Sequence, residues 1–153
     1  NWRQNFKGVQ FLHEETNLLL TGAVDDIWFD LDTEELIVVD YKATSKNDEV
    51  SLDAEWQISY KRQMEFYQYL LRRNGFKVSN TGYFVYCNGD RGRERFNEVL
   101  EFKMSLIPYT GSEKWIESTL FDIFELLNQD AIPSFKKSCK YCQYIEKTQL
   151  YNI

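Results

Sequence analysis

Apolar positions in the first part of the chain predict strands before any helix. Three segments rich in apolar and β-branched residues cover about 8–13, 18–29 and 36–42. Polar turns at 14–17 and 30–35 separate them. We therefore expect the chain to begin as an antiparallel meander of three strands.

From residue 53 the pattern changes to the period of a helix. Apolar and aromatic residues recur every three or four positions through 53–74, and Gly75 follows as a stop signal. Strands are then expected over 82–87 and 99–106, and a second helix over 115–127. This order of elements predicts an α/β fold, with helices packed on a mixed sheet.

The segment 99–106 alternates between apolar and polar residues. Its apolar positions are Leu100, Phe102, Met104 and Leu106, and its polar positions are Glu101, Lys103 and Ser105. Such a strand has one packed face and one face in water, and we expect the apolar set on the packed face.

Length and composition favour one globular unit. With 153 residues, of which 43% are hydrophobic, the chain can bury one sizeable core, so we expect residues 1–153 to form a single domain. Because the chain starts at Asn1 rather than Met, we expect a piece of a longer protein. Three cysteines, an odd number, favour a reducing compartment, and no run approaches the roughly 20 apolar residues of a membrane span. These features predict a cytoplasmic protein with no membrane partner.

The formal net charge of -6 argues against nucleic-acid binding through a bulk positive field. Local basic clusters remain, and one of them, on the predicted helix 53–74, comprises Lys61, Arg62, Arg72 and Arg73. Taken singly, such a cluster is more often a solvated helix face than a binding surface.

The stretch "VVDYKAT" at 38–44 ends an apolar strand with an acid and a base. If the preceding turn is centred between positions 32 and 33, Asp25 and Asp40 are cross-strand neighbours with Cα atoms about 4.5–5.5 Å apart. Lys42 then shares the face of Asp40, and Tyr41 points to the other face.

Two carboxylates on an apolar face repel each other and are costly to desolvate without a positive partner. A hard divalent cation, Mg²⁺ or Mn²⁺, suits them, because it takes carboxylate, carbonyl and water oxygens and leaves positions open for phosphate. Lys42 would lie beside the cation, where it can orient or help deprotonate the attacking water and offset charge on phosphate. An isolated acid and lysine at this spacing more often only mark a strand leaving the core.

Three ordered motifs resemble the RecB-like branch of the PD-(D/E)XK nuclease superfamily, which is related to CRISPR-associated and AddB-type exonuclease domains. They are Gly22-Ala23-Val24-Asp25, Val39-Asp40-Tyr41-Lys42 and Gln63-Met64-Glu65-Phe66-Tyr67. Each motif is weak alone, but the ordered set is specific, and the resemblance covers nearly the whole chain. It implies a restriction-endonuclease-like mixed β-sheet flanked by helices.

The resemblance also implies roles for individual residues. Asp25 and Asp40 would bind the metal with the Tyr41 carbonyl, Lys42 would be the catalytic lysine, and Gln63 and Tyr67 would face the nucleic-acid strand. The implied activity is a Mg²⁺- or Mn²⁺-dependent DNA nuclease, of exonuclease type, acting in repair, recombination or defence. Its partners would be DNA, single-stranded or at ends, and a helicase or other subunit of a larger complex.

The chain departs from the family pattern in two places. Many RecB-like nucleases carry a further His or Glu ligand on a helix before the first motif, and this chain has almost no room for that helix. His13 is the one histidine, and we expect it to be an exposed strand residue more often than a ligand.

The pair Cys139 and Cys142 resembles part of an iron-sulfur motif, but four thiolates are needed and only Cys87 remains, so we do not expect a cluster.

These departures from the family pattern leave a second hypothesis about function open. In it, the chain is a catalytically inactive nuclease-like module that binds DNA or a partner protein.

Overall fold

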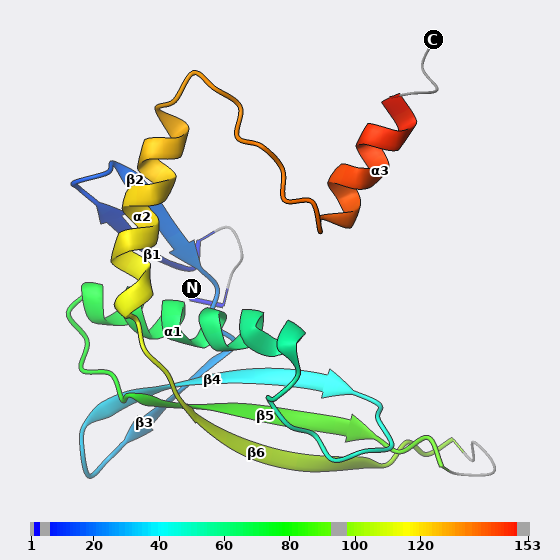
Figure 1. The fold of residues 1–153 in the computed structure, drawn as a ribbon. Helices are drawn as coiled ribbons and strands as arrows, with labels where there is room; N and C mark the ends of the chain where they lie inside the picture. The colour runs from blue at the N-terminus through cyan, green and yellow to red at the C-terminus, as the bar shows by residue number, and fades with distance from the viewer. Residues whose placement is uncertain (1, 4–6, 93–97, 150–153) are drawn as a thin grey trace.

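A four-stranded mixed sheet carries the motif residues (Figure 1). Its strands, in spatial order, are β3 (Asp26–Asp30), β4 (Glu35–Thr44), β5 (Thr81–Gly89) and β6 (Phe102–Thr110). The central pair β4 and β5 is parallel, and both outer pairs are antiparallel. The structure is a computed structural model that describes residues 2–3, 7–92 and 98–149. The expected α/β fold with a mixed sheet is confirmed.

The first two strands form a sheet of their own. β1 (Val9–His13) and β2 (Leu18–Gly22) make an antiparallel hairpin outside the four-stranded sheet. The predicted single strand over 18–29 is therefore wrong, and so is the three-stranded meander. The chain changes sheets at Val24, whose N–H donates to the Trp2 carbonyl and whose side chain is buried.

Helix α1 (Ile58–Arg73) lies across one face of the sheet (Figure 1). A short 3-10 helix, η1 (Glu55–Gln57), precedes it, so the predicted helix over 53–74 is confirmed with a later start. The buried side chains of α1 include Met64, Leu70 and Leu71, which are 0% exposed. This apolar face of the helix forms the core together with the inner face of the sheet.

Two further helices follow the sheet. α2 (Lys114–Leu127) confirms the predicted second helix. α3 (Lys140–Gln149) was not predicted, and an extended stretch separates it from α2 in Figure 1. Within the described part of the chain, no helix is long and apolar enough to cross a membrane.

The predicted orientation of the apolar set at 99–106 is wrong. Phe102, Met104 and Leu106 are 51%, 60% and 54% exposed, whereas Ile107 and Tyr109 are partly buried against the core. In the register of β6 against β5, Ile107 and Tyr109 face α1. No described helix covers the face of β6 that carries Phe102, Met104 and Leu106. The alternation located a strand correctly, but it did not show which face is covered.

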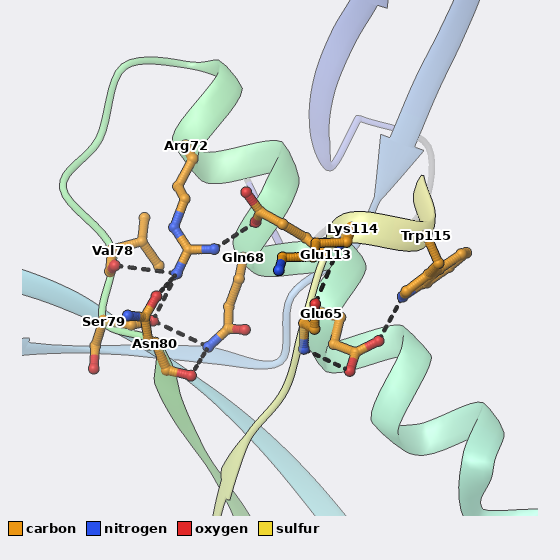
Figure 2. A network of polar contacts seen from close by, with 10 residues as sticks. Glu65, Gln68, Arg72, Val78, Ser79, Asn80, Glu113, Lys114 and Trp115 are labelled. Carbon is orange, nitrogen blue, oxygen red and sulfur yellow. Dashed lines mark hydrogen bonds and ion pairs between the residues drawn. The ribbon is translucent and has the colours of Figure 1, made fainter. Parts of the chain in front are cut away.

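A buried carboxylate joins α1 to β6 and α2. Glu65 is 8% exposed and accepts hydrogen bonds from the Tyr109 hydroxyl at 2.7 Å, the Ser112 N–H at 3.0 Å and the Trp115 indole N–H at 2.6 Å. Figure 2 shows Glu65 pointing toward the start of α2. Burial, together with this carboxylate, raises the pKa of Tyr109. Three donors bind the one buried carboxylate, so Glu65 fixes the position of α1 relative to β6 and α2.

The same face of α1 holds the segment that leads into β5. Arg72 donates to the carbonyls of Val78 and Ser79 and pairs with Glu113 at 2.5 Å, and Gln68 donates to the Ser79 carbonyl at 3.1 Å (Figure 2). Arg72 therefore has a structural role, and the basic cluster predicted on this helix is not one uniform solvated face.

Replacement of Glu65 by Ala is expected to lower the free energy of unfolding by about 3 kcal/mol, because it leaves three hydrogen-bond donors without an acceptor in a largely buried site. Urea denaturation monitored by circular dichroism measures the loss. Glu125→Ala, at an exposed position of α2, is the matched control and should change stability by less than about 0.5 kcal/mol. Equal effects of the two substitutions would contradict this role of Glu65.

A second acid, Glu117 on α2, predicts a pH dependence of stability. Burial opposes its ionisation, but hydrogen bonds from Tyr69 and Arg73 and a contact with His13 hold the pKa of Glu117 below its ordinary value. A depressed pKa contributes stability above the pKa of the unfolded chain, and this stability is lost as pH falls through the folded pKa. The advantage of the wild type over Glu117→Gln should therefore shrink below about pH 5 in urea titrations. A constant difference down to about pH 3 would show that the ionised form is not favoured.

Candidate functional site

The β3–β4 hairpin has the register that the sequence predicts. Asp26 pairs with Val39 and Phe29 pairs with Leu36. Asp25 immediately precedes the first of these pairs, and Asp40 immediately follows it on the partner strand. The turn symmetry therefore correctly predicted that the two acids come together.

Asp40 is a buried carboxylate with unsatisfied oxygens. Its side chain is 2% exposed, next to Val38 and Val39, which are 0% exposed. Among the described residues, neither carboxylate oxygen has a hydrogen-bond donor in good geometry, although Lys42 Nζ lies 2.5 Å from Oδ2 as an ion pair. Burial raises the pKa of Asp40, the Lys42 ammonium opposes this, and the charge of Asp25 adds to the rise. The fold thus holds Asp40 in a buried environment where Lys42 only partly offsets the cost of its charge.

Asp25 lies near Asp40 and is more exposed to solvent than Asp40. Its Oδ2 accepts a hydrogen bond from the backbone N–H of Tyr41 at 3.0 Å, which ties the start of β3 to β4. A surface hollow of about 340 Å³ opens beside it, lined by Arg3, Ala23, Val24, Asp25 and Tyr41. A small ion or solvent therefore has access to this carboxylate.

The glycine of the first motif allows the preceding hairpin to approach α1. A Cβ added at Gly22 would lie 2.7 Å from the Tyr67 ring and 2.9 Å from Leu70. Any side chain at this position would have to displace the Tyr67 ring or the Leu70 side chain. The close approach also places Asp25, three residues later, where its charge acts on Tyr67.

Lys42 is held by side chains of α1. Its Nζ donates to Gln63 Oε1 at 3.2 Å, and the Gln63 amide nitrogen donates to the Tyr67 hydroxyl at 2.9 Å. Tyr60 supplies a ring face 4.3 Å from Nζ. Of the predicted substrate-binding pair, Gln63 contacts the lysine and Tyr67 contacts Gln63, and Tyr67 itself is only 8% exposed.

The Tyr41 side chain points away from Asp40, as predicted. Its hydroxyl donates to Asp26 Oδ2 at 2.7 Å, and this bond lowers the pKa of Asp26.

The sequence assigned Tyr60 only to the packed face of a helix, and its contact with Lys42 was missed. The spacing of three residues between Tyr60 and Gln63 was the available signal, because it puts both on one helix face.

This donor set fits a hard divalent cation. Apart from the Lys42 ammonium beside Oδ2, the Asp40 oxygens have no hydrogen-bond partner among the described residues, and Asp25 presents a carboxylate that solvent can reach. The described ranges contain no group of three or more His, Cys, Asp or Glu that could hold a metal ion. The remaining positions would fall to water or backbone carbonyl oxygens, which suits Mg²⁺ or Mn²⁺ better than a cation that prefers nitrogen or sulfur.

The family comparison agrees with this geometry. The model of the PD-(D/E)XK nuclease superfamily matches residues 1–146. The chain belongs to the PD-(D/E)XK nuclease superfamily. Nothing matched significantly among curated proteins or among solved structures. Members of the superfamily are generally nucleases that act on DNA with divalent metals such as Mg²⁺.

Other residues considered as ligands lie elsewhere in this PD-(D/E)XK fold. His13 is 1% exposed and contacts Thr16 at 2.8 Å, Glu15 at 2.9 Å and Glu117 at 3.0 Å, so the expectation of an exposed histidine is wrong. Its ring nitrogens face the β1–β2 turn and α2, and no contact joins it to Asp40. It therefore anchors α2 to the first hairpin.

The three cysteines are free thiols in this PD-(D/E)XK domain. Cys87 belongs to β5, whereas Cys139 and Cys142 lie at the start of α3. The backbone N–H and thiol of Cys142 lower the pKa of Cys139. The expectation that Cys139 and Cys142 hold no iron-sulfur cluster stays a prediction.

Binding of a divalent cation should raise the melting temperature of the wild-type protein. At a concentration of about 100 Kd the gain is about 2.7 kcal/mol, or about 5–10 °C for a chain of this size. Asp40→Asn should abolish the gain in Mg²⁺ or Mn²⁺, because the amide removes one of two charges. Differential scanning fluorimetry measures both.

The matched control for this measurement is Asp26→Asn. Asp26 is in the same hairpin, but Tyr41 and the Ile27 N–H already satisfy its carboxylate. This variant should keep the metal-dependent gain. A gain that survives in Asp40→Asn, or is lost in both variants, would rule out Asp40 as a specific ligand.

Proposed function

We propose that this chain is a metal-dependent DNA nuclease that hydrolyses phosphodiester bonds. The observation that carries the proposal is the Asp40 carboxylate, which is buried, lacks hydrogen-bond donors among the described residues and has Lys42 beside it. A fold that only needs stability gains little from such a group, because Lys42 compensates only part of its desolvation. A site that binds a cation and a phosphate needs it.

We assign Asp25, Asp40 and the Tyr41 carbonyl as the cation ligands and Asp25, Asp40 and Lys42 as the catalytic set. When bound, Mg²⁺ or Mn²⁺ would supply Lewis-acid stabilisation of the phosphate oxygens and favour ionisation of the attacking water. Lys42 Nζ, oriented by Gln63, donates a hydrogen bond to the attacking water or to a phosphate oxygen. Tyr67 holds Gln63, and Tyr60 packs against the Lys42 ammonium. The ammonium therefore needs little rearrangement during the reaction.

The ordered motifs support a narrower assignment to the RecB-like branch. On this basis we propose exonuclease-type cleavage of single-stranded DNA or DNA ends, in repair, recombination or defence, with a helicase or other subunit as partner. A single domain over 1–153 and a cytoplasmic location stay predictions of the sequence.

A second function is favoured by one observation. The described residues hold two acids at the site rather than a larger ligand cluster. A module with a weak metal site could bind DNA or a partner protein without cleaving it. Cleavage assays separate the two functions.

Labelled single- and double-stranded DNA incubated with Mg²⁺ or Mn²⁺ should be cleaved by the wild-type protein. Asp40→Ala and Lys42→Ala should each lower kcat by about a hundredfold or more, because each removes charge that stabilises the transition state. Asp26→Asn serves again as the control that keeps activity. DNA binding without cleavage would support the second function, and equal cleavage by all variants would indicate a contaminating nuclease.

A further inference from the structure

An exposed tryptophan lies beside the candidate site. Trp56, in η1, is 54% exposed and is the most exposed of the four tryptophans in the chain. The others have visible structural contacts: Trp2 packs on Phe76, Trp115 donates to Glu65, and Trp28 packs on Tyr83. A large ring left open to solvent near a site for DNA is a candidate contact for substrate.

The ring of Trp56 is close to the lysine of the site. Tyr60 packs edge-to-face on it, with ring centroids 5.4 Å apart, and Tyr60 also contacts Lys42 Nζ, which lies 4.3 Å from its ring centroid. These two contacts keep the Trp56 ring within about 10 Å of Lys42, so one strand can reach both.

A rigid turn presents Trp56. The next residue, Gln57, is 1% exposed, accepts a hydrogen bond from the Ala54 N–H and donates to the Ser51 carbonyl and the Tyr86 hydroxyl. Tyr86 lies on β5 directly opposite Lys42 on β4. The turn is therefore fastened to the strand pair that carries the site, so the position of the tryptophan is set before any ligand binds.

Positive charge accompanies the ring. Lys46, an exposed residue, has its Nζ 5.2 Å from the centroid of Trp56. Segment 45–57 starts at the end of the sheet toward which β4 and β5 point (Figure 1). An exposed ring with an exposed ammonium beside it matches a nucleotide, whose base can stack while its phosphate pairs with the lysine.

We propose that Trp56 is a stacking platform for one unpaired base of the DNA strand, next to the phosphate held at Asp40 and Lys42. Base pairs in the interior of a duplex keep both faces of each base stacked, so away from duplex ends only an unpaired nucleotide can reach the ring. The proposal rests on the proposed function for the position of the phosphate. It makes single-stranded DNA the substrate class and Trp56 the residue that selects it.

The first test measures binding in EDTA, where no cleavage occurs. The probe is a fluorescein-labelled oligothymidylate of about 12 nucleotides, within the range of known single-strand sites, compared with a blunt hairpin duplex. Trp56→Ala should weaken single-strand binding by about tenfold to a hundredfold, the usual cost of a lost base stack, and leave duplex binding unchanged. Trp56→Phe should restore most of the affinity, because a phenyl ring still stacks.

The second test removes the base instead of the ring. An abasic position moved along the oligothymidylate should weaken wild-type binding at one place by the same factor as Trp56→Ala. The same abasic oligonucleotide should cause no further loss in Trp56→Ala, because the two changes delete one interaction. Trp28→Ala, a partly exposed tryptophan that packs on Tyr83, is the matched control, and unchanged circular dichroism melting of each variant shows that it folds.

Equal losses on single strands and duplex, no loss in Trp56→Ala, or additive effects of the two changes would overturn the stacking proposal. Parallel cleavage assays in Mg²⁺ keep it distinct from the proposed function. A wild-type protein that shows the Trp56-dependent binding but never cleaves DNA would refute the nuclease and keep the platform. Cleavage that Trp56→Ala leaves intact on both substrates would refute the platform and keep the nuclease.

Discussion

The candidate site depends on one costly interaction, the burial of the Asp40 carboxylate with a single positive neighbour. A carboxylate that loses water without gaining donors costs several kcal/mol, and Lys42 offsets only part of this. The structure keeps the two groups together because β4 is buried on both faces at this point and because Gln63 holds the lysine from the helix side. The unfavourable placement of Asp40 is therefore enforced by the packing around it.

That enforcement comes from the contacts of α1. Glu65 connects the helix to β6 and α2, and Arg72 connects it to the strand entry before β5. Tyr67 lies between these two anchors along the helix, and Gln63 lies two residues before Glu65, so the distance of both side chains to β4 depends on how α1 is held. Polar contacts of α1 thus hold a polar site that would otherwise relax toward solvent.

The two faces of the sheet have different roles. The inner face carries Asp40 and Lys42 under α1, and the outer face exposes Phe102, Met104 and Leu106. Exposed apolar residues are common on proteins, but several in one row on one strand form a contiguous patch. This patch belongs to the face opposite the site, so it is separate from the chemistry at Asp40.

The sequence by itself determined most of the elements and the pairing of the acids, although it missed α3 and joined β2 and β3 into one strand. Helix period located α1 and α2, and the symmetry of one polar turn placed Asp25 opposite Asp40, because a hairpin is a local structure whose register follows from its own residues. Tertiary structure alone decided the split of segment 18–29 between two sheets, the covered face of β6 and the burial of His13. Each of these depends on which distant segment packs against the residue, and neither alternation nor composition contains that information. Tertiary structure also decided the exposure of Trp56, because the helical spacing of apolar residues does not show which of them other segments cover.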